Sequence, residues 1–212
     1  DCVDFDGSPF DLGLTRRLRG TIGAVGAGEG VFVSAPRSVL SSLPSRGEGR
    51  PFAFFERALP VPLASFRVSW SQRIDAVGTQ SAVDAGVGLY VSGNPFHSLL
   101  VRYGGATTTS DGGFSLFEYG EPVDGQPELV EFTDLGRSLA RGRFMRFELE
   151  VRRSASASSA TVVIDGVVAK ADVPLRIHAY GGAPHMGIGI INSDGPGDLV
   201  SVYVDDVVLE SR

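Results

Sequence analysis

Apolar and polar residues alternate with a period of two along several stretches, and the clearest of them closes the chain. In residues 199–209 one face is polar, and the opposite face carries Val200, Val202 and Val204. This alternation predicts a half-buried β-strand. Continuing the same register would carry Asp206 onto the apolar face, where an unpaired carboxylate costs several kcal/mol. We therefore expect a cation, a cluster of N–H donors or a local bulge at this position.

The same period of two recurs in residues 64–72 and 142–152, where apolar side chains occupy every second position. Trp70 shares its face with other apolar residues, so we expect it in the core. Asp165-Gly166 lies between two Val-rich runs and is the strongest hairpin signal in the chain. No stretch keeps a period of 3.6, so the pattern predicts about a dozen strands and no helix.

Glycine and proline punctuate these strands, with 28 Gly and 12 Pro among 212 residues. Many short strands joined by tight turns are typical of two packed antiparallel sheets rather than one open sheet. All-β sandwiches of this length are commonly one unit. We therefore predict a single all-β domain over residues 1–212.

The charge balance excludes two classes of partner. Lys and Arg number 19 against 25 Asp and Glu, with a formal net charge of −6, so we expect neither nucleic acid nor an anionic lipid surface. No apolar run is long enough for a transmembrane segment. The chain does not begin with Met, which indicates a trimmed N-terminus, and the single cysteine, Cys2, excludes an intrachain disulfide and allows a lipoprotein origin.

Several motifs carry a resemblance to known proteins. The chain has a long alternating strand in its last third, a Val-Ile-Asp-Gly-Val-Val hairpin, a terminal Val-Tyr-Val-Asp-Asp-Val strand and an opening Asp4-Phe5-Asp6-Gly7. This order resembles laminin-G-like, concanavalin A-like jelly rolls and calcium-containing jelly-roll carbohydrate-binding modules. The resemblance implies a two-sheet antiparallel jelly-roll β-sandwich whose first and last strands lie side by side. It also implies a structural calcium ion, because terminal acids in such modules lie beside one; the candidate ligands are Asp4, Asp6, Asp205 and Asp206.

Catalytic motifs of related jelly rolls are incomplete here. The Glu-x-Asp-x-x-Glu spacing of retaining glycosidases is missing, and Glu148 and Glu150 share a face with arginines that would neutralise them. Five residues superficially resemble the catalytic set of alginate-type lyases: Arg146, Glu148, Arg152, His178 and Tyr180. The motif departs from the lyase pattern, because Arg176 stands where glutamine is expected before the Ile-His pair. His97, His178 and His185 are isolated from one another, so no zinc site is predicted.

Sugar binding requires aromatic platforms beside polar hydrogen-bonding groups. Loop aromatics and their polar neighbours are the best candidates: Asn94, Phe96, His97, Tyr119, His178 and Tyr180. We therefore predict a non-catalytic recognition module, secreted or on a cell surface, with a glycan or polysaccharide as its ligand. A glycoside hydrolase or polysaccharide lyase of the same fold is the first alternative. A protein-binding or architectural domain, with another surface protein as partner, is the second.

Overall fold

In the computed structural model, the described residues are 2–3, 14–19, 24–33, 37–43, 52–59, 65–76, 82–92, 95–104, 112–123, 125–177, 181–194 and 200–211. They form fifteen β-strands and no α-helix. This part of the chain accordingly contains no helix that could cross a membrane.

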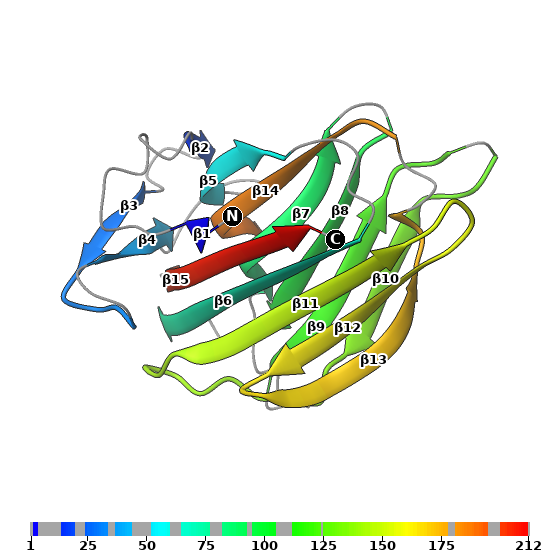
Figure 1. Ribbon diagram of the computed structural model, residues 1–212. Helices are drawn as coiled ribbons and strands as arrows, with labels where there is room; N and C mark the ends of the chain where they lie inside the picture. Colours follow the sequence, from blue (N-terminus) through cyan, green and yellow to red (C-terminus); the bar gives the residue numbers. More distant parts are fainter. Residues whose placement is uncertain are drawn as a thin grey trace.

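Two antiparallel sheets pack face to face, with the seven-stranded sheet behind the eight-stranded one in Figure 1. The eight-stranded sheet has the order β13 (Val167–Leu175), β12 (Ser158–Ile164), β11 (Met145–Arg153), β6 (Ser65–Ala76), β15 (Val200–Ser211), β4 (Arg37–Leu43) and β3 (Ala24–Glu29), with β1 (Cys2–Val3) on β15. The seven-stranded sheet has the order β10 (Leu129–Asp134), β9 (Gly113–Gly120), β8 (His97–Gly104), β7 (Ala82–Ser92), β14 (Ala183–Asp194), β5 (Phe52–Ala58) and β2 (Thr15–Arg19). The predicted fold class, an all-β jelly-roll sandwich, is confirmed.

Alternate residues of both sheets fill the space between them. Trp70 on β6 is fully buried, as predicted, and its ring stacks on Phe147 of β11 with the ring centres 5.3 Å apart. Phe147 also meets Phe114 of β9 edge-on at 5.1 Å, which joins the two sheets through their aromatic side chains. The Trp70 indole N–H donates to the Gln72 amide oxygen at 3.0 Å, so its one polar group is satisfied inside the core.

The predicted Asp-Gly hairpin joins β12 to β13. Asp165 has φ 50° and Gly166 has φ 77°, the two positive values that a tight type I′ turn requires. The strands on either side pair from Ile164 and Val167 outward. This prediction is confirmed.

The two ends of the chain lie side by side, as the jelly-roll resemblance implied. Cys2 pairs with Val208 and Val3 with Val207, so β1 adds to β15 in antiparallel fashion (Figure 1). In β15 the pairing with β6 shifts between Asp205 and Val208, and Asp206 has φ 51°. A bulge at Asp206 therefore shifts the register, so that Asp206 does not continue the apolar face and the residues after it return to the core.

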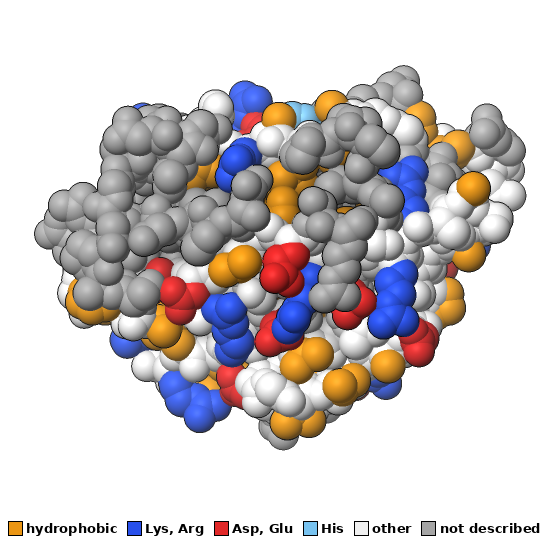
Figure 2. All heavy atoms as spheres, viewed as in Figure 1, with side chains coloured by type: hydrophobic (Ala, Val, Ile, Leu, Met, Phe, Trp, Pro, Cys, Tyr) orange, Lys and Arg blue, Asp and Glu red, His pale blue; other side chains and the backbone are white. Residues whose placement is uncertain are grey.

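Charged side chains of both signs are interspersed over the outer face of the eight-stranded sheet (Figure 2). Glu148 accepts a hydrogen bond from Arg67 on β6, and Glu150 accepts one from Arg152 at 3.1 Å. The expectation that these acids are neutralised is confirmed, with Arg67 rather than Arg146 as the partner of Glu148. Both carboxylates of this strand are therefore engaged by arginines.

Candidate functional site

A groove crosses the outer face of the seven-stranded sheet. Its wide part has a volume of about 690 Å³ and its narrow part about 410 Å³. The two parts share four lining residues and are one continuous depression; these residues are Phe52, Tyr90, Phe96 and Ile191. Both volumes lie in the range of small-molecule and sugar sites.

Two facing glycines lie beneath the floor of this groove, which Ile191 and Leu100 line. Gly88 on β7 pairs with Gly187 on β14. A Cβ on Gly88 would lie 2.4 Å from Ile191 Cδ1 and 2.7 Å from Leu100 Cδ2. The absence of a side chain at Gly88 therefore lets Ile191 and Leu100 lie flat on the sheet, which deepens the groove.

Aromatic rings form the walls. Tyr90 lies 6.1 Å from Phe96, and Phe96 lies 6.2 Å from Tyr119, measured between ring centres. At the β9–β10 end, Phe117 and Phe132 stack at 4.7 Å, and Phe132 is 56% exposed. Exposed phenyl faces are the surfaces on which the C–H face of a sugar stacks.

Phe96 is held in place by Glu121. The Phe96 amide donates to Glu121 Oε2 at 2.8 Å, and the Glu121 amide donates to the Phe96 carbonyl at 2.9 Å. Because both bonds fix the backbone before β8, the ring of Phe96 has a set position between Tyr90 and Tyr119.

A polar cluster lies at the narrow end, built from one outward-facing residue on each of β2, β5, β14 and β7. Its members are Arg17, Glu56 and Tyr90, which line the groove, and His185, which lies against Tyr90 and Glu56. The His185 ring stacks on the Tyr90 ring with centres 5.2 Å apart and planes 8° apart. His185 Nδ1 lies 2.7 Å from Glu56 Oε1, and Arg17 Nε donates to Glu56 Oε2. Glu56, only 7% exposed, is thus the common partner of the cluster.

The environment keeps Glu56 ionised and Tyr90 protonated. Burial alone would raise the pKa of Glu56, but hydrogen bonds from Tyr90 and Arg17, with the charges of Arg17 and His185, outweigh it and lower that pKa. Burial raises the pKa of Tyr90, and the hydrogen bond to the Glu56 carboxylate raises it further. The hydrogen bond with Glu56 raises the pKa of Arg17, which stays charged.

Stability should depend on pH through Glu56. Its pKa in the folded state lies below the ordinary value of 4.5, so its contribution is fully present above about pH 4.5 and is lost as pH falls through the folded pKa. We expect the difference in unfolding free energy between wild type and Glu56→Gln to shrink across this acidic window, measured by denaturant unfolding. A difference that stays constant down to about pH 3 would contradict the assignment, and the exposed Glu131→Gln variant is the control.

A second charged pair lies at the wide end. Arg102 Nε is 3.3 Å from Asp84 Oδ1, and both residues are buried. The Arg102 guanidinium lies 5.0 Å from the ring centre of Phe117 and 5.5 Å from that of Phe132. Arg102 is thus held between an acid and two phenyl faces.

The predicted ligand-binding residues fall into three groups. Phe96 and Tyr119 line the groove. His97 is fully buried on the core side of β8, where its Nε2 lies 2.8 Å from Glu118 Oε1, so it does not line the groove. Asn94, His178 and Tyr180 lie outside the described residues.

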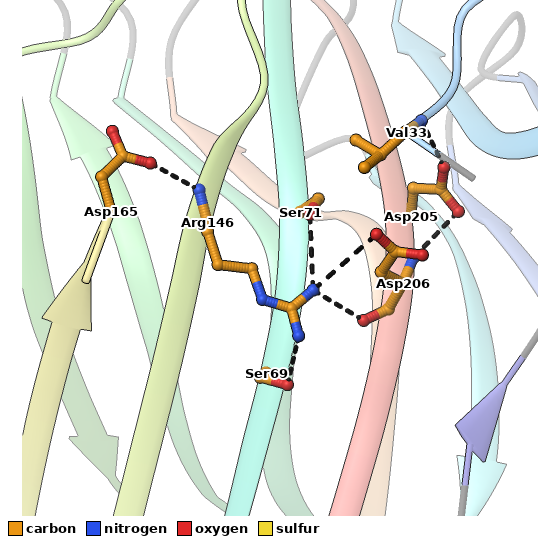
Figure 3. Close-up of polar contacts among 7 residues, drawn as sticks. All are labelled: Val33, Ser69, Ser71, Arg146, Asp165, Asp205 and Asp206. Atoms are coloured by element: carbon orange, nitrogen blue, oxygen red, sulfur yellow. Dashed lines mark hydrogen bonds and ion pairs between the residues drawn. The ribbon is translucent and has the colours of Figure 1, made fainter.

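The two acids of β15 are engaged by the protein itself (Figure 3). Asp205 is 2% exposed and accepts hydrogen bonds from the backbone amides of Val33 and Asp206, at 2.7 and 2.8 Å. The Asp206 carboxylate lies 4.0 Å from Arg146. Within the described ranges, no three His, Cys, Asp or Glu side chains gather closely enough to hold a metal ion.

The described pair alone therefore does not form a calcium site. The other two candidate ligands, Asp4 and Asp6, lie outside the described residues. Calcium at this edge stays a prediction, tested by whether a chelator lowers the melting temperature.

Arg146 holds the bulge of β15 (Figure 3). Its guanidinium donates to the Asp206 carbonyl at 3.2 Å and to the hydroxyls of Ser69 and Ser71 at 2.7 and 3.4 Å. We expect Arg146→Met to lower the free energy of unfolding by about 1–2 kcal/mol, because a half-exposed charged donor is lost. Denaturant unfolding measures the loss. Arg152→Met, which removes one exposed ion pair, should change it by less than about 0.5 kcal/mol, and equal effects would contradict the role of the bulge.

Strand β11, which carries the residues that resemble the alginate-type lyase motif, does not line the groove. Arg146, Glu148 and Arg152 lie on β11 of the eight-stranded sheet, whereas the groove lies on the other sheet. The residues that form the polar cluster were not among the sequence candidates. One signal was present: Phe52-Ala-Phe54-Phe-Glu56 alternates, which places Glu56 on the same face as two phenylalanines.

No family model and no curated protein matches the chain. Solved structures do match. An endo-β-1,4-glucuronan lyase from Trichoderma reesei has a TM-score of 0.67 at 10% identity, covering 100% of this chain and 94% of that one. An alginate lyase from Chlorella virus has a TM-score of 0.68 at 11% identity, covering 100% and 99%. A β-glucanase catalytic domain from Podospora anserina has a TM-score of 0.60 at 11% identity, covering 97% and 92%.

These likenesses show the fold. The chain has the concanavalin A-like jelly-roll architecture of polysaccharide lyases and glucanases. The finer likeness to laminin-G-like domains and carbohydrate-binding modules stays a prediction.

Proposed function

We propose that this jelly roll is a polysaccharide lyase that cleaves a uronic-acid-containing glycan in its groove by β-elimination. The observation that carries the proposal is that Tyr90 lines the narrow end of the groove while its ring stacks on His185, which contacts the ionised Glu56. A histidine and a tyrosine held in one orientation by a shared carboxylate are a typical acid–base arrangement.

The reaction requires one base, one acid and one neutralising group. The base removes the C5 proton of the uronic acid, the C4–O4 bond breaks, a C4=C5 double bond forms, and the acid protonates the departing oxygen. Glu56 faces His185 Nδ1, so in the neutral imidazole the Nδ1–H tautomer is favoured and Nε2 is left as the base. The raised pKa of Tyr90 keeps its phenol protonated, so it has a proton to donate.

Arg17 supplies the neutralising charge. Its side chain is 54% exposed beside Glu56, and its pKa is raised by that hydrogen bond. A guanidinium near the carboxylate of the sugar makes the adjacent C5 proton easier to remove, because it stabilises the negative charge that develops there. The three side chains thus cover the three roles.

Hydrolysis fits the described groove less well. A glycosidase requires a protonated carboxyl and a second carboxylate across the scissile bond. The pKa of Glu56 is lowered, which is the wrong direction for an acid. Two other acids of the groove are engaged by the protein itself. Asp84 lies beside Arg102, and Glu121 accepts a hydrogen bond from the Phe96 amide.

The structural neighbours support an enzyme more than a non-catalytic module. Two of these neighbours are a glucuronan lyase and an alginate lyase, and the third is a β-glucanase. We therefore place the enzyme, which was only an alternative in the sequence analysis, ahead of the binding module. A glycan ligand is common to both.

Incubation with a panel of polysaccharides tests the proposal. The panel comprises polyglucuronate, alginate, uronate-containing heteropolymers and a neutral mixed-linkage β-glucan. We expect ultraviolet absorbance from the new C=C bond with a uronate polymer, together with new reducing ends. Reducing ends without absorbance would indicate a hydrolase, and binding with neither signal would restore the non-catalytic module.

A further inference from the structure

The groove carries its charges unevenly. At the narrow end, Arg17 and Tyr90 line the groove beside a single carboxylate, Glu56, which His185 also contacts. Of the described residues that line only the wide part, one is basic and three are acidic: Arg102, Asp84, Glu121 and Glu128. The wide part therefore has a surplus of negative charge.

Arg102 does little to offset this surplus. It is 8% exposed, lies 3.3 Å from the Asp84 carboxylate and is covered by the phenyl faces of Phe117 and Phe132. Glu128 is exposed at the rim beside β10. A sugar carboxylate at this end would meet these acids, and the repulsion between like charges is stronger in a partly buried groove than in water.

The same end suits an uncharged sugar. Phe132 and Val130 are 56% and 50% exposed on β10, and Tyr119 lies on the neighbouring strand β9. A neutral pyranose can stack its C–H face on the phenyl ring while its hydroxyls donate to carboxylates. From β14, which carries His185, to β10 there are four strand spacings, about 19 Å, so several sugars can lie across the sheet.

We propose that the substrate is a heteropolysaccharide in which the cleaved uronic acid is flanked by neutral sugars, rather than a uniform polyuronate. The uronate lies at Arg17, Tyr90 and His185, and a neutral sugar lies over Phe132 and Tyr119 beside Glu128. This inference rests on the proposed lyase function and adds the charge pattern of the substrate to it.

Relative kcat/KM values on defined polymers test the inference. The substrates are polyglucuronate and several polymers in which glucuronate alternates with an uncharged hexose or N-acetylhexosamine. We expect kcat/KM for at least one alternating polymer to exceed that for polyglucuronate about tenfold or more at low salt. This ratio should decrease at higher salt, because salt screens the repulsion between the acids of the rim and the substrate.

A charge reversal at the rim distinguishes the effect of charge inside the groove from the effect of the net charge of the protein. Glu128→Lys should raise kcat/KM on polyglucuronate by roughly three- to tenfold at low salt, because attraction replaces repulsion. Glu131→Lys is the matched control: it makes the same change in net charge on β10, at an exposed residue that does not line the groove. We expect it to leave polyglucuronate cleavage unchanged.

The possible failures are distinguishable. Cleavage of polyglucuronate as fast as of every alternating polymer would overturn the inference and leave the lyase function standing. Equal gains from Glu128→Lys and Glu131→Lys would also overturn it, because net charge rather than the groove would then be responsible. Absence of the unsaturated product with every uronate polymer would overturn the lyase function, and the inference with it.

Discussion

Replacement of Tyr90 by phenylalanine is expected to lower kcat on a cleaved polysaccharide by about 100- to 10,000-fold, the usual loss when a positioned acid is removed. The ring remains, so its stacking on His185 and its contact with Phe96 remain, and KM should change by a few-fold at most. Initial rates of formation of the unsaturated product measure the effect.

Tyr203→Phe is the matched control for this experiment. Tyr203 lies on β15 of the opposite sheet, next to Arg73, and loss of its hydroxyl should leave kcat unchanged. A Tyr90→Phe variant with wild-type kcat would remove Tyr90 from the mechanism. If Tyr90→Phe raised KM and left kcat unchanged, the hydroxyl would serve binding only.

Truncation of Trp70 to alanine is expected to lower the free energy of unfolding by about 3–5 kcal/mol, because a fully buried indole is replaced by a cavity. The variant also leaves the Gln72 amide oxygen without its indole donor and removes the partner on which Phe147 stacks. For a domain of this size the melting temperature should fall by roughly 6–20 °C.

Two comparisons accompany this stability measurement. Trp70→Phe keeps a ring in the core and should lose less than the alanine variant. Val168→Ala removes a residue that is 58% exposed on β13 and should change stability by less than about 0.5 kcal/mol. A Trp70→Ala protein as stable as Val168→Ala would contradict the position of the indole at the centre of the core.

Period-two patterns made much of the fold predictable. Alternation in 64–72 and 142–152 identified the inward faces of β6 and β11, and Asp165-Gly166 identified the turn between β12 and β13. These are local signals, because side-chain alternation and positive φ depend on neighbouring residues alone. The same reasoning predicted a cation, a cluster of N–H donors or a bulge at Asp206, and the structure has the bulge.

Pairing between distant strands was not predictable in the same way. Arg17, Glu56, Tyr90 and His185 are spread over about 170 positions of the sequence, and none of them lies in a recognisable motif. His185 looked isolated because its partners belong to β5 and β7, and those contacts depend on strand order. The candidates chosen from loop aromatics included two residues of the groove, Phe96 and Tyr119, but none of the polar cluster.

The sequence by itself determined the fold class, the burial of Trp70 and the hairpin at Asp165-Gly166, because each follows from composition or from neighbours along the chain. Only the tertiary structure decided which sheet carries the groove, how Gly88 and Gly187 deepen it, and that Glu56 joins Arg17, Tyr90 and His185. The physical reason is that hydrogen bonds between strands distant in sequence set the register, and the register decides which side chains share a surface.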